Sequence, residues 1–164
     1  MVNDDLTGHL VLLGGVVWNE ITERLSEMAK LPVTQVTDAQ LESGDIFVAE
    51  VDGEERQFWP KFSGEDKQVL VEDVGLLARV PNPSNSSRTL TICNGIHSRG
   101  VVGAVRTLTD AQLRDGNERY IATKLGNAKS FAILMSVQVI NNKAMTPDLN
   151  GPEVVRYQWA PDAA

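Results

Sequence analysis

The chain of 164 residues carries 22 acidic and 15 basic side chains, a net charge of -7, and 42% hydrophobic residues. This composition is that of a globular domain, and it excludes the disordered, collagen-like and membrane-embedded classes. The acidic balance, with a pI near 4.8, does not favour attraction to phosphate backbones or anionic lipid, so we expect neither nucleic acid nor membrane as a partner.

The first predicted unit is a strand followed by a helix, over residues 9–31. A continuous apolar run at 9–13 ends at Gly14-Gly15, which is typical of a buried strand that stops at a tight turn. From 16 to 30, apolar residues recur every three or four positions, which predicts a helix that ends before Pro32. Such a unit brings a ligand to the carboxyl end of the strand in many α/β proteins.

The middle of the chain, residues 45–80, is predicted to be rich in β-hairpins. Short β-prone runs lie at 45–50, 56–62 and 68–71, and turn signals at Asp52-Gly53 and Ser63-Gly64 separate them.

The segments on either side of these hairpins have weaker signals. Residues 37–41 predict a single helical turn before them. An apolar strand at 74–80 follows the hairpins, and we expect a loop at 81–87 because that segment holds two prolines.

The second strand–helix unit covers residues 88–126. A strand at 88–93 leads into the polar segment 94–100, and a helix of small residues is predicted at 101–108. A further helix at 118–125 ends at Gly126.

Two terminal strands are predicted between residues 130 and 159. The strongest, at 130–140, is nearly all apolar and is expected near the centre of the sheet, whereas 154–159 reads as an edge strand. No linker interrupts the chain. We therefore predict one α/β domain over 1–164, with a Rossmann-like sheet, two βα units and a β-hairpin-rich middle insertion.

The first candidate ligand contact is the turn at Gly14 and Gly15. A glycine turn between a buried strand and a helix lets the backbone approach a ligand, with free amides and the positive end of the helix facing it, so a phosphate would fit. The alternative is a plain tight turn. Asn19, within one turn of the predicted helix start, could donate a hydrogen bond to a ligand held over Gly15.

The second candidate is the loop that follows the strand at 88–93, because four polar side-chain types converge there. Arg99 could pair a phosphate or carboxylate through two hydrogen bonds, and Ser98 could cap the helix or contact the same anion. His97 could act as a general acid or base, the alternative being a loop histidine. The predicted ligand-binding residues of this loop are Asn94, Gly95, Ser98, Arg99 and Gly100.

Metal and redox chemistry are not indicated by the sequence. The single cysteine, Cys93, leaves no internal disulfide and is expected to be a small buried hydrophobe. His9 and His97 are too far apart to form a metal-ligand motif, so no metal site is predicted, and the sequence names no cofactor. The N-terminus has no basic stretch and no long apolar segment, which predicts a cytoplasmic protein.

The glycine turns after two buried strands, at Gly14, Gly15, Asn94, Gly95 and Gly100, resemble those of small Rossmann-like domains that bind or sense nucleotides. The SLOG-type sensors of bacterial conflict systems are examples of such domains. The resemblance covers the two βα units and implies a nucleotide or a nucleotide-derived ligand, held as an analogy of fold.

Three functions follow as hypotheses. The leading one is binding or sensing of a small phosphorylated ligand at the paired strand ends, with Arg99 as the anion anchor. The second is a small hydrolase acting on a nucleotide-derived or sugar-phosphate ligand with His97 as acid or base, and the third is a protein-interaction module whose hairpins add a strand to a partner. A homo-oligomer or a larger protein complex remains open in each of them.

Overall fold

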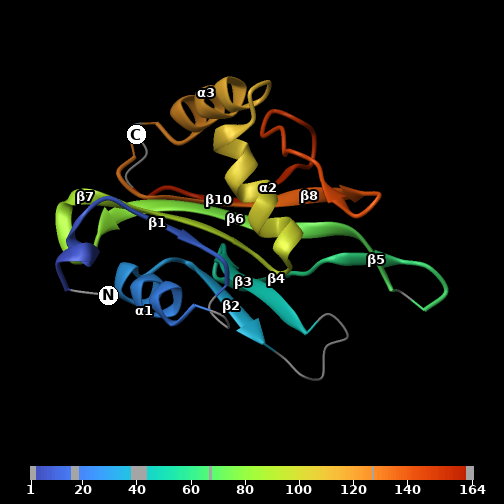
Figure 1. Cartoon of the computed structure of the whole chain (residues 1–164), viewed down its shortest axis with the longest axis horizontal. Helices are drawn as coiled ribbons and strands as arrows, with labels where there is room; N and C mark the ends of the chain where they lie inside the picture. The colour runs from blue at the N-terminus through green and yellow to red at the C-terminus, as the bar shows by residue number, and fades with distance from the viewer. Residues whose placement is uncertain (1–2, 16–18, 38–43, 67, 127, 162–164) are drawn as a thin grey trace.

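The computed structural model describes residues 3–15, 19–37, 44–66, 68–126 and 128–161, and it is built in layers around a seven-stranded sheet. Figure 1 shows helices α2 (Ser98–Thr109) and α3 (Arg114–Lys124) above this sheet, and helix α1 (Glu20–Ala29) with a small second sheet below it. We name the two sides of the large sheet the α2 face and the α1 face. The predicted α/β class is confirmed.

The large sheet runs in the order β1-β7-β6-β8-β10, with β5 paired to β6 and β9 paired to β8. Its strands are β1 (Leu10–Leu13), β5 (Lys61–Ser63), β6 (Val69–Asn82), β7 (Asn85–Gly95), β8 (Phe131–Ile140), β9 (Lys143–Ala144) and β10 (Val155–Trp159). The pairing of β1 with β7 is parallel, and the other pairings among the described strands are antiparallel.

The small sheet consists of β2 (Val33–Thr37), β3 (Asp45–Val51) and β4 (Glu54–Phe58), in that order. The β3–β4 hairpin turns at Asp52 and Gly53, which both have positive φ (54° and 80°), so the predicted hairpin is confirmed there. A short 3-10 helix, Asn3–Thr7, precedes β1.

Alternation along the strands sends side chains to a separate core on each face of the large sheet. On β6, Leu76 packs on the α1 face with Phe47 of the small sheet, and the adjacent Leu77 packs on the α2 face with Leu125. Strands β6, β7 and β8 therefore read as apolar runs because both of their faces are covered.

The prediction of a loop at 81–87 is wrong, because most of this segment belongs to two strands: β6 continues to Asn82 and β7 begins at Asn85. Pro81 pairs with Thr89 of β7, while the pairing of β6 with β8 ends at Arg79. Beyond Arg79 this stretch is thus an edge strand on its β8 side, where a residue that lacks an N–H is tolerated.

The other predicted elements are close to those observed, with shifted ends, but the sequence does not predict strands β2 and β9 or the short 3-10 helix. Helix α1 begins at Glu20 instead of 16, with residues 16–18 outside the described part, and α3 begins at Arg114. The helical turn predicted at 37–41 lies outside the described residues except for Thr37, which ends the unpredicted strand β2. Strand β10 is at the sheet edge as expected, and β8 lies beside the central β6.

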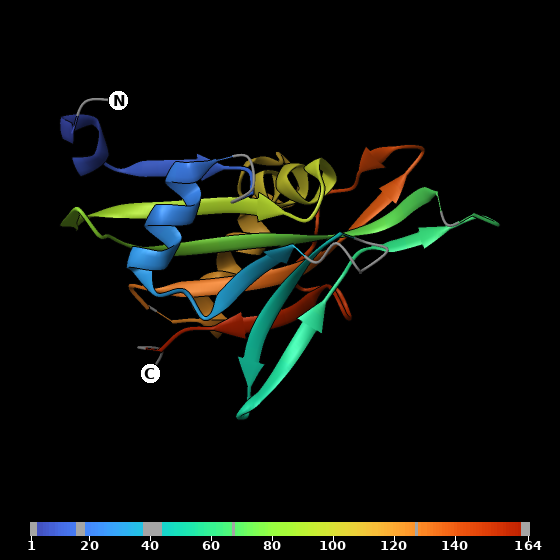
Figure 2. The same cartoon turned by 90° about the horizontal axis from the view of Figure 1, so that it is seen from below.

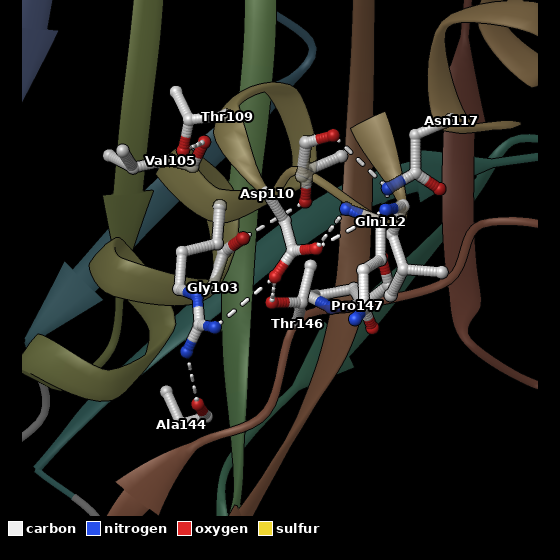
Figure 3. Close-up of polar contacts among 12 residues, drawn as sticks. Gly103, Val105, Thr109, Asp110, Gln112, Asn117, Ala144, Thr146 and Pro147 are labelled. Atoms are coloured by element: carbon white, nitrogen blue, oxygen red, sulfur yellow. Dashed lines mark hydrogen bonds and ion pairs between the residues drawn. The ribbon is translucent and has the colours of Figure 1, made fainter. Parts of the chain in front are cut away.

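A polar network around Asp110 closes the turn between α2 and α3 (Figure 3). Its carboxylate accepts hydrogen bonds from the hydroxyl of Thr146 at 2.7 Å, the N–H of Gln112 at 2.9 Å and the N–H of Leu113 at 3.2 Å. Arg106 adds an ion pair at 3.2 Å. These contacts, led by that of Thr146, lower the pKa of Asp110 to about 2.

Asn117 continues this network inside the protein, where its side chain is fully buried. Its amide nitrogen donates to the carbonyls of Thr107 and Pro147 at 3.1 and 2.9 Å, and its oxygen accepts from the N–H of Leu149 at 2.8 Å. The amide thus ties α3 to α2 and to the chain that follows β9 (Figure 3).

None of the helices in the described part of the chain has the length and apolar character that a membrane span requires.

Candidate functional site

The carboxyl ends of β1 and β7 lie side by side because the two strands are parallel and in register, with Leu13 opposite Cys93. The N–H of Gly14 donates to the carbonyl of Cys93 at 3.0 Å, which fixes the start of the first glycine turn. After these strands, α1 and α2 leave on opposite faces of the sheet, as Figure 2 shows from the α1 side. The structure therefore brings Gly14 and Gly15 together with Asn94.

A chain of hydrogen bonds crosses this region and orients its amide side chains. The Nε2 of Gln35 donates to a carboxylate oxygen of Asp45 at 3.1 Å, and its Oε1 accepts from the Nδ2 of Asn94 at 2.9 Å. The Oδ1 of Asn94 then accepts from the N–H of Gly95 at 2.6 Å. An ionised carboxylate only accepts, so Asp45 at one end sets the direction of the whole chain.

Gly15 packs directly against this amide chain. A Cβ placed on Gly15 would lie 2.9 Å from the Oε1 of Gln35 and 3.1 Å from the Oδ1 of Asn94. Gly14 differs, because it has a φ of 98° and no atom of the described residues lies within 4 Å of its hypothetical Cβ. The first glycine thus supplies the positive φ that this turn requires, and the second allows close approach to the amide side chains.

A cavity of about 300 Å³ lies between α1, β2 and the α1 face of the sheet, and Asn94 forms part of its wall. Its floor is apolar and made of residues that are nearly inaccessible to solvent. Its rim holds carboxylates, hydroxyls and one ammonium from α1 and β2. The lining residues are Glu23, Ser26, Glu27, Lys30, Leu31, Val33, Thr34, Gln35, Phe47, Leu76, Ile92 and Asn94.

Asn19 is the N-cap of α1 in the structure. Its Oδ1 accepts hydrogen bonds from the N–H groups of Ile21 and Thr22 at 3.1 and 3.2 Å, which satisfies two donors that a helix start leaves open. The side-chain oxygen is thus used by the helix itself. The predicted contact between Asn19 and a ligand stays a prediction that only its Nδ2 could fulfil.

The N-terminus of α2 is occupied by a carboxylate of the protein, that of Asp73 on β6. This side chain has no exposed surface and accepts hydrogen bonds from the N–H groups of Val74, His97 and Gly100. Burial raises the pKa of Asp73 above its ordinary value, although these donors act in the opposite direction. An internal carboxylate therefore takes the position in which a helix start would hold an external anion.

Gly95 and Gly100 allow α2 to approach the sheet so closely. A Cβ on Gly95 would lie 2.4 Å from the backbone nitrogen of Val101, and one on Gly100 would lie 2.5 Å from the carbonyl oxygen of Val74. Both glycines thus have a packing role at the start of α2. Their predicted contact with a ligand is untested.

His97 is the N-cap residue of α2, and its imidazole packs against Phe62 of β5. The ring centroids are 5.7 Å apart at an interplanar angle of 84°. The Nε2 atom is buried and has no hydrogen-bond partner among the described residues. A general acid or base must reach its substrate, so the hydrolase hypothesis requires Phe62 to move away from this ring.

The predicted anion anchor, Arg99, contacts the turn that follows β8. Its Nε and Nη2 donate to the backbone oxygen and the Oδ1 of Asn142 at 2.9 and 2.7 Å, and its Nη1 donates to the Oγ of Ser98 at 2.9 Å. Arg99 and Ser98 start α2, on the opposite face from the cavity beside Asn94. These contacts use three of the five N–H donors of Arg99, so an anion would bind the remaining two or displace Asn142.

Cys93 is buried, and desolvation raises the pKa of its thiol to about 11. It stays protonated at neutral pH, as suits the small buried hydrophobe predicted from the sequence. In the described part of the chain, no group of three histidine, cysteine or acidic side chains is placed to hold a metal ion.

Sequence reasoning missed three residues that organise this region, namely Gln35, Asp45 and Asp73. Asp73 had a signal, because the pair Glu72-Asp73 interrupts an otherwise apolar strand and a buried charge requires partners. Gln35 and Asp45 had none, since their role depends on how the small sheet packs against the large one.

Comparison with known proteins adds no assignment. No protein-family model, no curated protein and no solved structure is significantly similar to this chain.

Proposed function

We propose that the chain binds a small nucleotide-like ligand in the crevice at the carboxyl ends of β1 and β7. One observation carries the proposal: these two strands are parallel neighbours, and the helices that follow them leave on opposite faces of the sheet. In open α/β sheets such a point is where ligands bind. The Rossmann-like character that we propose for this protein is confined to this pair of strands.

The chemistry of the adjoining cavity supports a ligand with a flat ring and hydroxyl groups. Phe47, Leu76 and Ile92 provide an apolar floor for a ring, and a volume of about 300 Å³ is at the small end of ligand pockets. Glu23 and Glu27 on the rim can accept hydrogen bonds from sugar hydroxyls, as acidic side chains do in dinucleotide sites.

The phosphate of such a ligand belongs at the turn of Gly14 and Gly15, away from the carboxylates of α1. Two observations support this position: no atom of the described residues lies within 4 Å of a hypothetical Cβ on Gly14, and Gly15 approaches Asn94 closely. Binding without turnover is the simpler role, because it does not require the imidazole of His97 to become accessible.

A thermal-shift screen against adenosine, adenosine monophosphate and ribose phosphate tests the proposal, with mass spectrometry of the same mixtures. A ligand at about one hundred times its Kd stabilises the protein by about 2.7 kcal/mol, which raises the Tm by several degrees. Accumulation of product would instead support the hydrolase.

Two leucine substitutions on α1 locate the binding. Ser26→Leu fills part of the cavity, because Ser26 lines it, and should remove the shift. Arg24→Leu places the same side chain at an exposed position of the same helix that does not line the cavity, and should preserve it. An equal shift in both variants contradicts the proposed site, and a panel without any shift contradicts the proposed ligand class.

A further inference from the structure

A second cavity, of about 450 Å³, lies where β5, β6, β8 and β10 meet. It is distinct from the cavity beneath α1, since the two share no lining residue. Six of its lining side chains are polar, and they come from four different strands and from the chain just before β10. These are Lys61, Glu72, Ser136, Gln138, Glu153 and Arg156.

Glu72 of β6 lines this cavity and contacts three of its other polar side chains. It is 8% exposed, and its neighbour Asp73 points to the opposite face of the sheet, at the start of α2. Donors from three strands converge on the Glu72 carboxylate: the Nζ of Lys61 at 3.2 Å, the Nη1 of Arg156 at 3.3 Å and the Nε2 of Gln138 at 2.9 Å.

The carboxylate is ionised at neutral pH despite its burial. Burial alone would raise the pKa of Glu72, but hydrogen bonds from Lys61, Gln138 and Ser136 together bring it below its ordinary value. Glu72 therefore acts as a fixed negative charge that holds two cationic groups in the cavity lining, both in contact with its Oε1 atom.

The two cations, Lys61 and Arg156, keep donors that no acceptor among the described residues uses. Each contacts Glu72 and no other acceptor in the described part of the chain. An ammonium has three N–H donors and a guanidinium has five, so both can bind a further anion without leaving Glu72. The remaining acidic side chain of the lining, Glu153, is exposed to solvent, where water screens its charge.

We propose that this cavity is a second ligand site, which takes a small phosphorylated sugar with its phosphate between Lys61 and Arg156. Gln138, Ser136 and Glu153 offer donors and acceptors to the sugar hydroxyls, and the mainly polar lining does not suit a flat apolar ring. A structural ion-pair network alone would need neither the cavity nor the unused donors.

Amide NMR titration with glucose phosphate tests this site, with glucose and inorganic phosphate as separate probes. Glucose phosphate should perturb the signals of Ser136, Gln138 and Arg156 and saturate. Glucose should bind about tenfold more weakly or not at all, because it lacks the charge-assisted hydrogen bonds. Saturation by inorganic phosphate with the same Kd would overturn the sugar assignment.

Variants separate a ligand site from a structural network. Arg156→Gln and Lys61→Gln should each weaken glucose phosphate at least about tenfold. Arg114→Gln, an exposed change of the same kind at the start of α3, should leave the Kd unchanged. If Arg156→Gln destabilises the fold, the affinity of Lys61→Gln tests the site alone, because Lys61 is largely exposed and its substitution should leave the fold intact. Wild-type affinity for glucose phosphate in both variants would overturn the proposal.

The same titration of Ser26→Leu separates this proposal from the function proposed above. Ser26 lies outside the second cavity, so this variant should bind glucose phosphate as the wild type does. Loss of glucose phosphate binding in Ser26→Leu would place the sugar beneath α1 and overturn the second site.

Discussion

Replacing Asp73 by alanine should destabilise the protein strongly, because its carboxylate organises the start of α2. The N–H of His97 would lose its acceptor, and an unpaired donor of this kind costs about 1–3 kcal/mol. Val74 and Gly100 would each lose a hydrogen bond to the side chain of Asp73, although the N–H of Gly100 keeps the carbonyl of His97 at 3.1 Å. Removal of a buried carboxyl group offsets part of this loss. We expect a net decrease of about 2–4 kcal/mol in the free energy of unfolding.

Urea unfolding at neutral pH, followed by circular dichroism, measures this decrease. In a thermal melt the same decrease should lower the Tm by about 5–15 °C, at roughly 2–4 °C per kcal/mol for a chain of this size. Asp73→Asn is the matched control, because its side-chain oxygen still accepts hydrogen bonds, and it should lose less than Asp73→Ala. An Asp73→Ala variant within about 0.5 kcal/mol of the wild type would refute the role given to this carboxylate.

Three further predictions concern other parts of the fold. Gly15→Ala should displace the side chains of Gln35 and Asn94, because the new Cβ would lie 2.9 and 3.1 Å from their oxygen atoms. The side-chain amide NMR signals of both residues should then shift, and nucleotide binding should weaken. Unchanged signals would argue against this contact. Asp110, with a pKa lowered to about 2, should stabilise the protein above the ordinary aspartate pKa, and this stability should be lost as pH falls toward about 2. In thermal melts from about pH 5 to about pH 2, the Tm of Asp110→Asn should fall less than that of the wild type. Parallel curves of Tm against pH for the two proteins would contradict this prediction. Asn82→Ala should lower the free energy of unfolding in urea by about 2–4 kcal/mol, because the fully buried amide joins the N-terminal segment to the β6–β7 turn. A decrease below about 0.5 kcal/mol would count against that role.

Local patterns predicted the elements whose signals are complete within a few residues. The β3–β4 hairpin follows from Asp52-Gly53, and β8 follows from an apolar run that both cores require. The convergence of Gly15 and Asn94 also follows from the two strand–turn–helix patterns, because parallel neighbouring strands end at the same edge of a sheet.

Tertiary context decided the features that the sequence did not predict. Pro81 continues a strand because β8 does not pair with β6 beyond Arg79, and no local pattern reports where a neighbouring strand ends. Arg99 contacts Asn142, 43 residues away in sequence. Asn19 and Asp73 show a related limit, since helix caps and ligand-binding residues use the same polar side chains.

The most direct test of the central claim is to map the amide NMR shifts that adenosine monophosphate causes in the intact chain. Binding at the carboxyl ends of β1 and β7 predicts that the largest changes occur at Gly14, Gly15, Gln35 and Asn94, with smaller ones along the cavity side of α1. Changes concentrated elsewhere, for example around Tyr120 on α3, or no change at saturating nucleotide, would contradict the account.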